Sequence, residues 1–148
     1  MKKLLCLALV LIFTLVSCGA KTVEFQSVKD VVSNVTFRDL TYEPDLDVTL
    51  SQYNITDGIA EYYRITSGTG ATAEEITVFK VSDSSKIADI EKKCEERKAS
   101  VGEMYQTYKP AEMPMIEDAR IFSEGDYVIY ICVDNSEEIF KQLEQLFK

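Results

Sequence analysis

Hydrophobic residues in the middle of the chain recur with two different periods, and each period predicts an element. Residues 75–81 are rich in β-branched and aromatic side chains and end at a serine-rich break, which predicts a strand. After the break, large side chains recur at alternating steps of three and four, which predicts one helix over residues 87–108. The stripe consists of Ile87, Ile90, Cys94, Arg97, Val101, Met104 and Tyr108.

Arg97 breaks this stripe, because an apolar residue is expected at its position. A guanidinium there reaches water past its neighbours, stacks on a tyrosine or pairs with an acid, since leaving it buried alone costs several kcal/mol. Glu75 shares a strand face with Phe79 and Val81, which we expect to face the helix. We therefore predict that Glu75 and Arg97 form a partly buried pair, with either a structural or a binding role.

Weaker patterns predict the other elements. Helices are expected from Ser27 onward, over residues 47–53, and from Asp134 to the end, with Asp134 as the cap of the last one. Strands are expected over residues 60–66, 116–123 and 127–133. Residues 41–45 are predicted as a turn, and residues 109–114 as a crossing back to the sheet.

The order of these elements predicts an α+β fold. It corresponds to α-ββα-ββα, and the economical arrangement is a four-stranded, mainly antiparallel sheet with helices packed on one face. The other face of such a sheet is partly open, which makes it a possible docking surface.

The first seventeen residues predict a signal peptide. A short basic start, Met1-Lys2-Lys3, is followed by thirteen uncharged residues, too few for a bilayer span of about 20. The sequence Leu15-Val16-Ser17-Cys18 resembles the lipobox of bacterial lipoproteins, in which the peptide is cut before the cysteine and the thiol receives a diacylglyceryl group. The alternative is an ordinary signal peptide with an incidental cysteine.

This resemblance implies that Cys18 is the lipidation site. Residues 1–17 are then removed, residues 18–26 form a tether and residues 27–148 form a single α+β domain. Two acyl chains suffice for stable anchoring. We therefore expect the protein on the extracytoplasmic side of the cell membrane, held through the lipid anchor at Cys18.

Composition narrows the possible chemistry. The 148 residues contain no histidine, which removes the commonest general base and the commonest zinc ligand. Residues 18–148 carry 14 basic and 25 acidic side chains, a net charge of −11, so we expect no nucleic-acid partner. We also expect no catalytic residues, metal or cofactor. Adjacent acids such as Glu74-Glu75 are interpreted as solvated surface.

Two further sequence features leave structural questions open. The loop of residues 67–72 contains two glycines but lacks Gly-Lys-Ser/Thr and a following helix, so it indicates a hairpin connection and no nucleotide site. Cys94 and Cys132 are expected in the core as small apolar residues. A disulfide between them is the alternative, because helix and sheet pack face to face.

Several segments together resemble a bacterial family of domains of unknown function, catalogued as 4358. They are Tyr53, Glu61-Tyr62, residues 73–80, Glu95-Glu96-Arg97, Tyr105, residues 108–110 and residues 125–128. The resemblance covers roughly residues 30–147 and implies a small extracytoplasmic lipoprotein. It supplies no catalytic residues.

Three functional hypotheses follow. The first is a membrane-tethered binding or interaction module of the cell envelope, with an unknown envelope protein or ligand as partner. The second is a purely structural or stress-related envelope lipoprotein, and the third is a carboxylate-based enzyme that acts on cell-wall material. A pocket with two converging acids would favour the enzyme, and a flat aromatic patch would favour the binding module.

Overall fold

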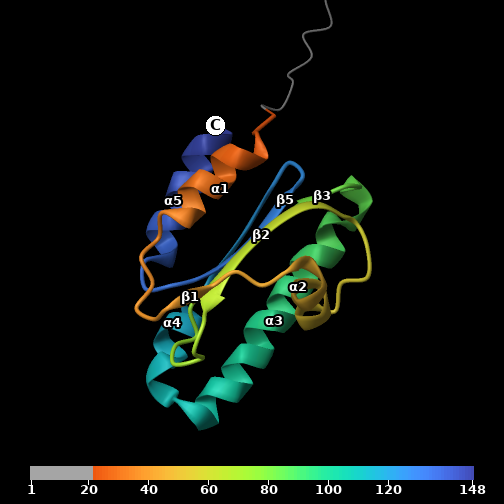
Figure 1. Ribbon diagram of the computed structural model, residues 1–148. Helices are drawn as coiled ribbons and strands as arrows, with labels where there is room; N and C mark the ends of the chain where they lie inside the picture. The colour runs from red at the N-terminus through yellow and green to blue at the C-terminus, as the bar shows by residue number, and fades with distance from the viewer. Residues whose placement is uncertain (1–21) are drawn as a thin grey trace, which may run out of the picture.

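The computed structural model describes residues 22–148, in which five strands form one antiparallel sheet (Figure 1). The strands are β1 Thr41–Tyr42, β2 Ile59–Ser67, β3 Glu75–Val81, β4 Arg120–Glu124 and β5 Tyr127–Cys132. Their order across the sheet is β1-β2-β3-β5-β4, which places β3 and β5 at the centre. The predicted α+β class is confirmed, and β3 has the predicted bounds.

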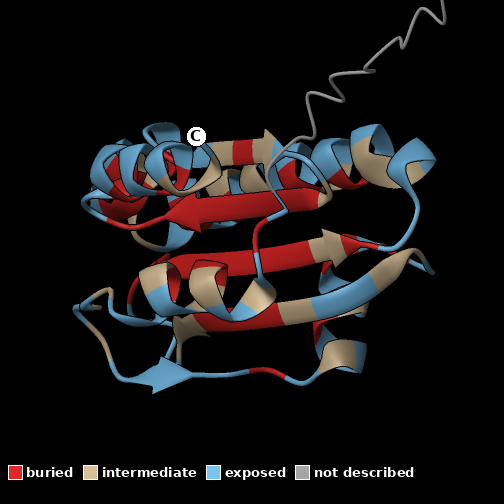
Figure 2. Ribbon diagram, turned by 90° about the horizontal axis from the view of Figure 1, so that it is seen from above, coloured by how far each residue is buried: buried red, intermediate tan, exposed pale blue. Residues whose placement is uncertain are grey.

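The prediction of four strands is wrong by one, because β1 lies in the segment predicted as a turn. Thr41 pairs with Ser67 and Tyr42 with Thr66, at the far end of the long strand β2. Both residues of β1 are exposed, so the strand has no buried face that a hydrophobic pattern could reveal (Figure 2). β1 forms because the edge of β2 presents unpaired backbone N–H and C=O groups, with which Thr41 and Tyr42 pair.

Helices lie on both faces of the sheet, so the prediction of helices on one face is wrong. The described helices are α1 Phe25–Ser33, α2 Leu46–Tyr53, α3 Ile87–Tyr108, α4 Met113–Glu117 and α5 Ser136–Phe147. One core joins α2, α3 and α4 to the sheet, and a second core on the opposite face joins α1 and α5 to it (Figure 1). Within residues 22–148, both faces of the sheet are thus covered by helices, and the open face expected as a docking surface is not found.

The central strands explain this three-layer arrangement. Every residue of β5 is buried, and its side chains alternate between the two cores (Figure 2). Phe79 of β3 faces α3, whereas its neighbour Val78 faces α1 and α5. Strands that are apolar on both faces need cover on both. The amphipathic helices α1 and α5 supply it with Val28, Val32, Ile139 and Leu143.

Helix α3 has the predicted bounds, but its last turns expose part of the predicted stripe. Ile90, Cys94 and Val101 are buried, and Tyr105 is buried in place of Met104 and Tyr108. The helix runs past the end of the sheet, so its final residues have no sheet to cover them (Figure 1).

Two predictions in the C-terminal half are wrong, one for residues 110–117 and one for the cap of the last helix. Residues 110–117 form a 3₁₀ turn followed by α4 instead of the predicted crossing and strand, because Pro110 and Pro114 occupy the first turns of these helices. The last helix begins after Asn135, and the predicted cap Asp134 instead binds Arg38.

The N-terminal end of the described chain packs into the fold. Val23 is buried, and its carbonyl oxygen accepts a hydrogen bond of 2.8 Å from the hydroxyl of Tyr127. Helix α1 begins at Phe25, so residues 23–26 of the predicted tether belong to the domain. The predicted signal peptide and Cys18 lie outside the described residues. Among residues 22–148, no helix is both long and apolar enough to cross a bilayer.

Candidate ligand-binding site

A cavity of about 240 Å³ opens between α3, strand β2, the loop of residues 68–74 and the segment that leads into α2. Its charged lining consists of Arg64 of β2, Glu75 of β3 and Arg97 of α3. Exposed apolar side chains form its rim, namely Tyr42, Val48 and Met104. The loop of residues 67–72, predicted as a hairpin connection, joins β2 to β3 and forms one wall.

Glu75 and Arg97 are in direct contact at this cavity. The Nη2 and Nε atoms of Arg97 donate hydrogen bonds of 2.7 and 3.2 Å to Oε2 of Glu75. Glu75 is buried, and the side chain of Arg97 is 18% exposed. Arg97 also lies over the ring of Tyr53, with its Cζ atom 5.8 Å from the centroid. The guanidinium thus combines two of the three arrangements considered for it, pairing and stacking.

Arg64 is the site residue that sequence reasoning missed. Its side chain is 2% exposed, and its Nε lies 3.0 Å from Oε1 of Glu75, as an ion pair without hydrogen-bond geometry. Among residues 22–148, no acceptor takes a hydrogen bond from its buried Nε or Nη1. The sequence signal was partial. Arg64 alternates with Tyr63 and Ile65 on β2, but all three residues are buried, so the apolar pattern does not single out the face of Arg64.

Tyr53 completes the surroundings of the Glu75 carboxylate. Its hydroxyl donates to Oε1 at 2.6 Å and lies 2.8 Å from Oγ1 of Thr77. Oγ1 of Thr77 is itself 3.1 Å from the same carboxylate oxygen. The ring of Tyr53 is close to both guanidinium groups, because the Cζ of Arg64 lies 5.7 Å and that of Arg97 5.8 Å from its centroid. Both oxygens of Glu75 are therefore occupied by partners within the protein.

Helix α2 brings Tyr53 and the rim residue Val48 to the cavity. The carboxylate of Asp45 caps the helix by accepting a 2.9 Å hydrogen bond from the backbone N–H of Val48. Asn54 ends the helix in the left-handed conformation, with φ 52°. The two caps define a helix of eight residues whose last side chain is buried and whose first turn is exposed at the rim.

The electrostatics of the site leave a net positive charge. Burial alone would raise the pKa of Glu75, but the charges of Arg97 and Arg64 hold this pKa below its ordinary value. Burial and the charge of Glu75 raise the pKa of Tyr53, so its hydroxyl stays protonated. At neutral pH the site therefore contains two cations and one carboxylate.

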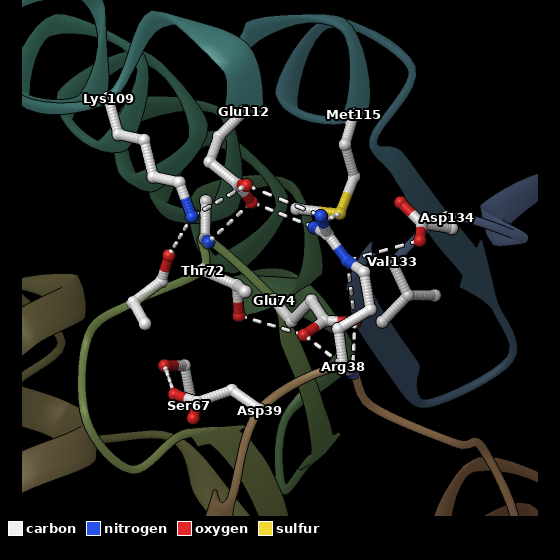
Figure 3. Close-up of polar contacts among 12 residues, drawn as sticks. Arg38, Asp39, Ser67, Thr72, Glu74, Lys109, Glu112, Met115, Val133 and Asp134 are labelled. Atoms are coloured by element: carbon white, nitrogen blue, oxygen red, sulfur yellow. Dashed lines mark hydrogen bonds and ion pairs between the residues drawn. The ribbon is translucent and has the colours of Figure 1, made fainter.

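A second cluster of charged residues, which we term the clasp, lies behind the loop that forms the cavity wall (Figure 3). The backbone N–H of Arg38 donates to both oxygens of Glu74 at 3.0 Å. Its guanidinium donates to the Glu112 carboxylate at 2.8 and 3.3 Å and lies 3.1 Å from Oδ2 of Asp134. Glu74 and Glu112 are each 2% exposed. The interpretation of Glu74-Glu75 as solvated surface is therefore wrong.

The clasp fixes the cavity wall. Oε2 of Glu112 accepts a 3.1 Å hydrogen bond from the backbone N–H of Ala73, and Glu74 accepts one of 2.8 Å from the hydroxyl of Thr72. On the inner side of the loop, the hydroxyl of Tyr105 donates to the carbonyl oxygen of Thr72 at 2.5 Å. The wall is thus held from both sides.

The first part of the same loop is held by Asp39, which lies next to the clasp (Figure 3). Its Oδ2 accepts hydrogen bonds of 2.5 and 2.6 Å from the hydroxyls of Ser67 and Thr69. These two hydrogen bonds hold the pKa of Asp39 well below its usual range. Gly70 then turns the chain with φ +72°, a conformation that glycine adopts without strain.

Cys94 and Cys132 are both fully buried and free of a disulfide. Burial raises the pKa of both thiols, that of Cys132 to about 12. Neither residue lines the cavity. Within residues 22–148, no group of three or more acidic or cysteine side chains is arranged to hold a metal ion.

Comparison with known proteins gives one match. A family model described as a domain of unknown function, DUF4358, matches residues 50–133. This range includes Tyr53, Arg64, Glu75 and Arg97, whereas the rim residues Tyr42 and Val48 precede it. No curated protein and no solved structure matches the chain significantly.

Proposed function

The chain belongs to the DUF4358 family of domains of unknown function, and on this premise we propose that it is a lipid-anchored extracytoplasmic binding module. Its ligand site is the cavity that contains Arg64, Glu75 and Arg97. The observation that carries the proposal is Arg64, a guanidinium 2% exposed whose buried Nε and Nη1 find no hydrogen-bond acceptor in residues 22–148. A buried charged donor without an acceptor is costly, and such groups gather where a ligand supplies the missing partner.

The lipid anchor is supported by the N-terminal sequence and by the distance from Cys18 to the fold. Five residue steps separate Cys18 from the buried Val23, so a fully extended chain spans about 17 Å between them. The domain then works close to the bilayer surface, on the extracytoplasmic side of the cell membrane.

The position of the cavity fits such an anchor. Val23 contacts Tyr127, which pairs with Lys80 at one end of β3, whereas Glu75 begins β3 and pairs with Cys132. Five residues of an antiparallel strand separate the two positions by about 17 Å. The cavity and the N-terminal attachment therefore lie toward opposite ends of the sheet, which leaves the cavity accessible when the N-terminal end faces the membrane.

Binding is better supported than catalysis. A carboxylate-based enzyme needs two acids with different protonation states, and the cavity lining contains one carboxylate, Glu75. The guanidinium groups around Glu75 keep its pKa low, so it has no proton to donate at neutral pH. A purely structural envelope protein, the second hypothesis, does not account for buried guanidinium donors without a hydrogen-bond acceptor at an accessible cavity.

Two experiments test the two parts of the proposal. For the anchor, Cys18→Ala is expected to accumulate as uncleaved precursor and to lose metabolic labelling by a fatty-acid analogue. Unchanged labelling would disprove lipidation at Cys18.

For the site, a photoreactive amino acid replaces Met104 at the rim, and the tagged chain is illuminated in native membranes. Intact-mass spectrometry is expected to show a small-molecule adduct at this position. The same amino acid in place of Gln142, on α5 at the opposite face of the sheet, is the control. Equal adducts at both positions, or none at Met104, would contradict a ligand site in the cavity.

A further inference from the structure

The guanidinium of Arg64 needs an acceptor that the protein does not supply. A guanidinium carries five N–H donors, and among residues 22–148 the one carboxylate at ion-pair distance from Arg64 is Glu75. Both Glu75 oxygens already accept hydrogen bonds, from Tyr53 and Arg97. The acceptor must therefore come from outside the chain.

The hydroxyls of Thr66, Ser67 and Thr72 in the cavity lining each have a partner other than Arg64. The hydroxyl of Thr66 donates to the carbonyl oxygen of Glu74, that of Ser67 to Asp39, and that of Thr72 to Glu74. Each is engaged with the structure around the loop. The lining also contains the amide of Gln52 and the hydroxyl of Tyr42, and Arg64 is its polar group with buried donors that lack an acceptor.

The charge balance selects the class of acceptor. With Arg64, Arg97 and Glu75 ionised, the cavity has one positive charge to neutralise. A carboxylate carries one negative charge, and its planar pair of oxygens matches the fork of a guanidinium. A phosphate monoester, with about −1.5 to −2 charges at pH 7, exceeds this balance and faces repulsion from Glu75.

Exposed apolar side chains gather at the cavity mouth. Residues 22–148 contain five exposed large hydrophobic side chains: Leu40, Tyr42, Val48, Met104 and Tyr108. Three of these form the rim, and Tyr108 packs edge-on against Tyr105, which also lines the cavity. Exposed apolar residues clustered at one opening indicate a surface that is covered by a ligand.

We propose that the cavity binds a small monocarboxylate with an apolar body, whose carboxylate contacts Arg64 and whose body lies against the rim of Tyr42, Val48 and Met104. This inference rests on the proposed function. The cavity volume of about 240 Å³ lies below the range of about 300–1,000 Å³ typical of drug-sized ligands, which limits the ligand to a small molecule.

Two probes of the same shape, one a carboxylate and one its neutral amide, test whether the cavity prefers a negative charge. The full mature chain in lipid nanodiscs is titrated with 3-phenylpropanoate and with 3-phenylpropanamide, and empty nanodiscs correct for partition into lipid. The carboxylate is expected to bind at least about tenfold more tightly than the amide, because the amide carries no charge for Arg64. Phenethyl phosphate, the dianionic probe, is expected to bind more weakly than the carboxylate.

Two variants assign the selectivity to the cavity. Arg64→Met is expected to bring the ratio of carboxylate to amide affinity close to one, whereas Arg120→Met, at an exposed arginine of β4, leaves it unchanged. Val48→Glu adds a negative charge at an exposed rim position and needs no change in the core. It is expected to weaken binding of the carboxylate at least about threefold more than that of the amide, and Val48→Gln is its neutral control.

The outcomes separate the inference from the proposed function. Equal affinities of the carboxylate and the amide, both weakened by Val48→Glu, would leave a binding cavity but overturn its preference for a carboxylate. Tighter binding of the phosphate would overturn the preference for a single charge. Absence of binding by any probe, together with absence of an adduct at Met104 in membranes, would overturn both proposals.

Discussion

Two clusters in this protein combine arginine with buried carboxylates, and they differ in how completely their donors are satisfied. In the clasp, the guanidinium of Arg38 contacts Glu112 and Asp134, and its backbone N–H binds Glu74. In the cavity, Arg97 is bonded to Glu75, but the buried Nε and Nη1 of Arg64 donate to no acceptor in the described chain. The arginine of the clasp thus has its partners within the protein, whereas the cavity retains arginine donors that a ligand can satisfy.

The difference follows from where each arginine lies. The side chain of Arg38 is 43% exposed, so water solvates it while its carboxylate partners are buried. Arg64 is 2% exposed and therefore depends on partners within the cavity. Satisfied clusters contribute to stability, whereas an unsatisfied buried charge reduces it unless a ligand binds. Variants in the two clusters should therefore separate stability from binding.

The largest loss of stability is expected for Glu75→Gln. This change removes the carboxylate that both buried guanidinium groups face, and breaking a buried pair by removing one partner costs about 3–5 kcal/mol. Urea unfolding of the variant measures the loss. Glu61→Gln, at an exposed acid on the neighbouring strand β2, is the matched control and is expected to change the free energy of unfolding by less than about 0.5 kcal/mol.

A double-mutant cycle tests whether Glu75 acts through Arg97. The combined variant Glu75→Gln with Arg97→Met is expected to lose less stability than the sum of the single losses, by about 0.5–3 kcal/mol. The reason is that each single variant leaves the other charge without its partner. Additive losses would show that the contact between the two residues does not couple them energetically.

A smaller loss is expected for Glu112→Gln in the clasp, about 1–3 kcal/mol, because the half-exposed Arg38 is solvated when its partner is lost. Hydrogen exchange is expected to accelerate at the N–H of Ala73, which donates to Glu112. Glu137→Gln, at an exposed acid of α5, is the control. Unchanged exchange at Ala73 would contradict the role of the clasp in holding the cavity wall.

Both clusters make the free energy of unfolding depend on pH. Burial opposes ionisation, but Arg97 and Arg64 lower the pKa of Glu75, and Arg38 with the N–H of Ala73 lowers that of Glu112. A lowered pKa in the folded state gives stability that is present above the unfolded value of about 4.3 and is lost as pH falls through the folded pKa.

The two contributions are separated by urea unfolding between about pH 3 and 7. Wild type is expected to lose stability as the pH falls below about 4.3, and Glu112→Gln, which lacks the contribution of Glu112, is expected to lose less over the same interval. Parallel curves for the two proteins would show that Glu112 is not ionised in the fold.

The sequence predicted those parts of the site that depend on neighbouring elements. Glu75 and Arg97 lie on a strand and on the helix that follows it, so strand alternation and helical periodicity suffice to face them toward each other. Arg64 depends on the pairing of β2 with β3, where it lies opposite Thr77. Alternation along β2 places Arg64 on the face opposite Tyr63 and Ile65, but apolar or aromatic residues lie on both faces, so the pattern alone does not show which face meets Glu75.

The clasp and the second helical layer required knowledge of the tertiary fold. Arg38 meets Glu112 across 74 residues of sequence, and no local pattern relates the two. Ile131 and Cys132 face opposite cores, so the apolar run of β5 indicated a buried strand without showing which helices cover each face.

Among the variants within the two clusters, the smallest effect on stability is expected for Arg64→Met. The guanidinium of Arg64 has one ion-pair contact within residues 22–148, and its buried Nε and Nη1 donate no hydrogen bond there, so removing it also removes a desolvation cost. Glu75 keeps its hydrogen bonds from Arg97 and Tyr53, and an unbranched apolar side chain can lie beside the Tyr53 ring. We expect the free energy of unfolding to change by less than about 1 kcal/mol, against a loss of about 1–3 kcal/mol for Arg97→Met. Urea unfolding without ligand measures both variants, and equal losses would make Arg64 a structural member of the cluster and remove the main support for a ligand site.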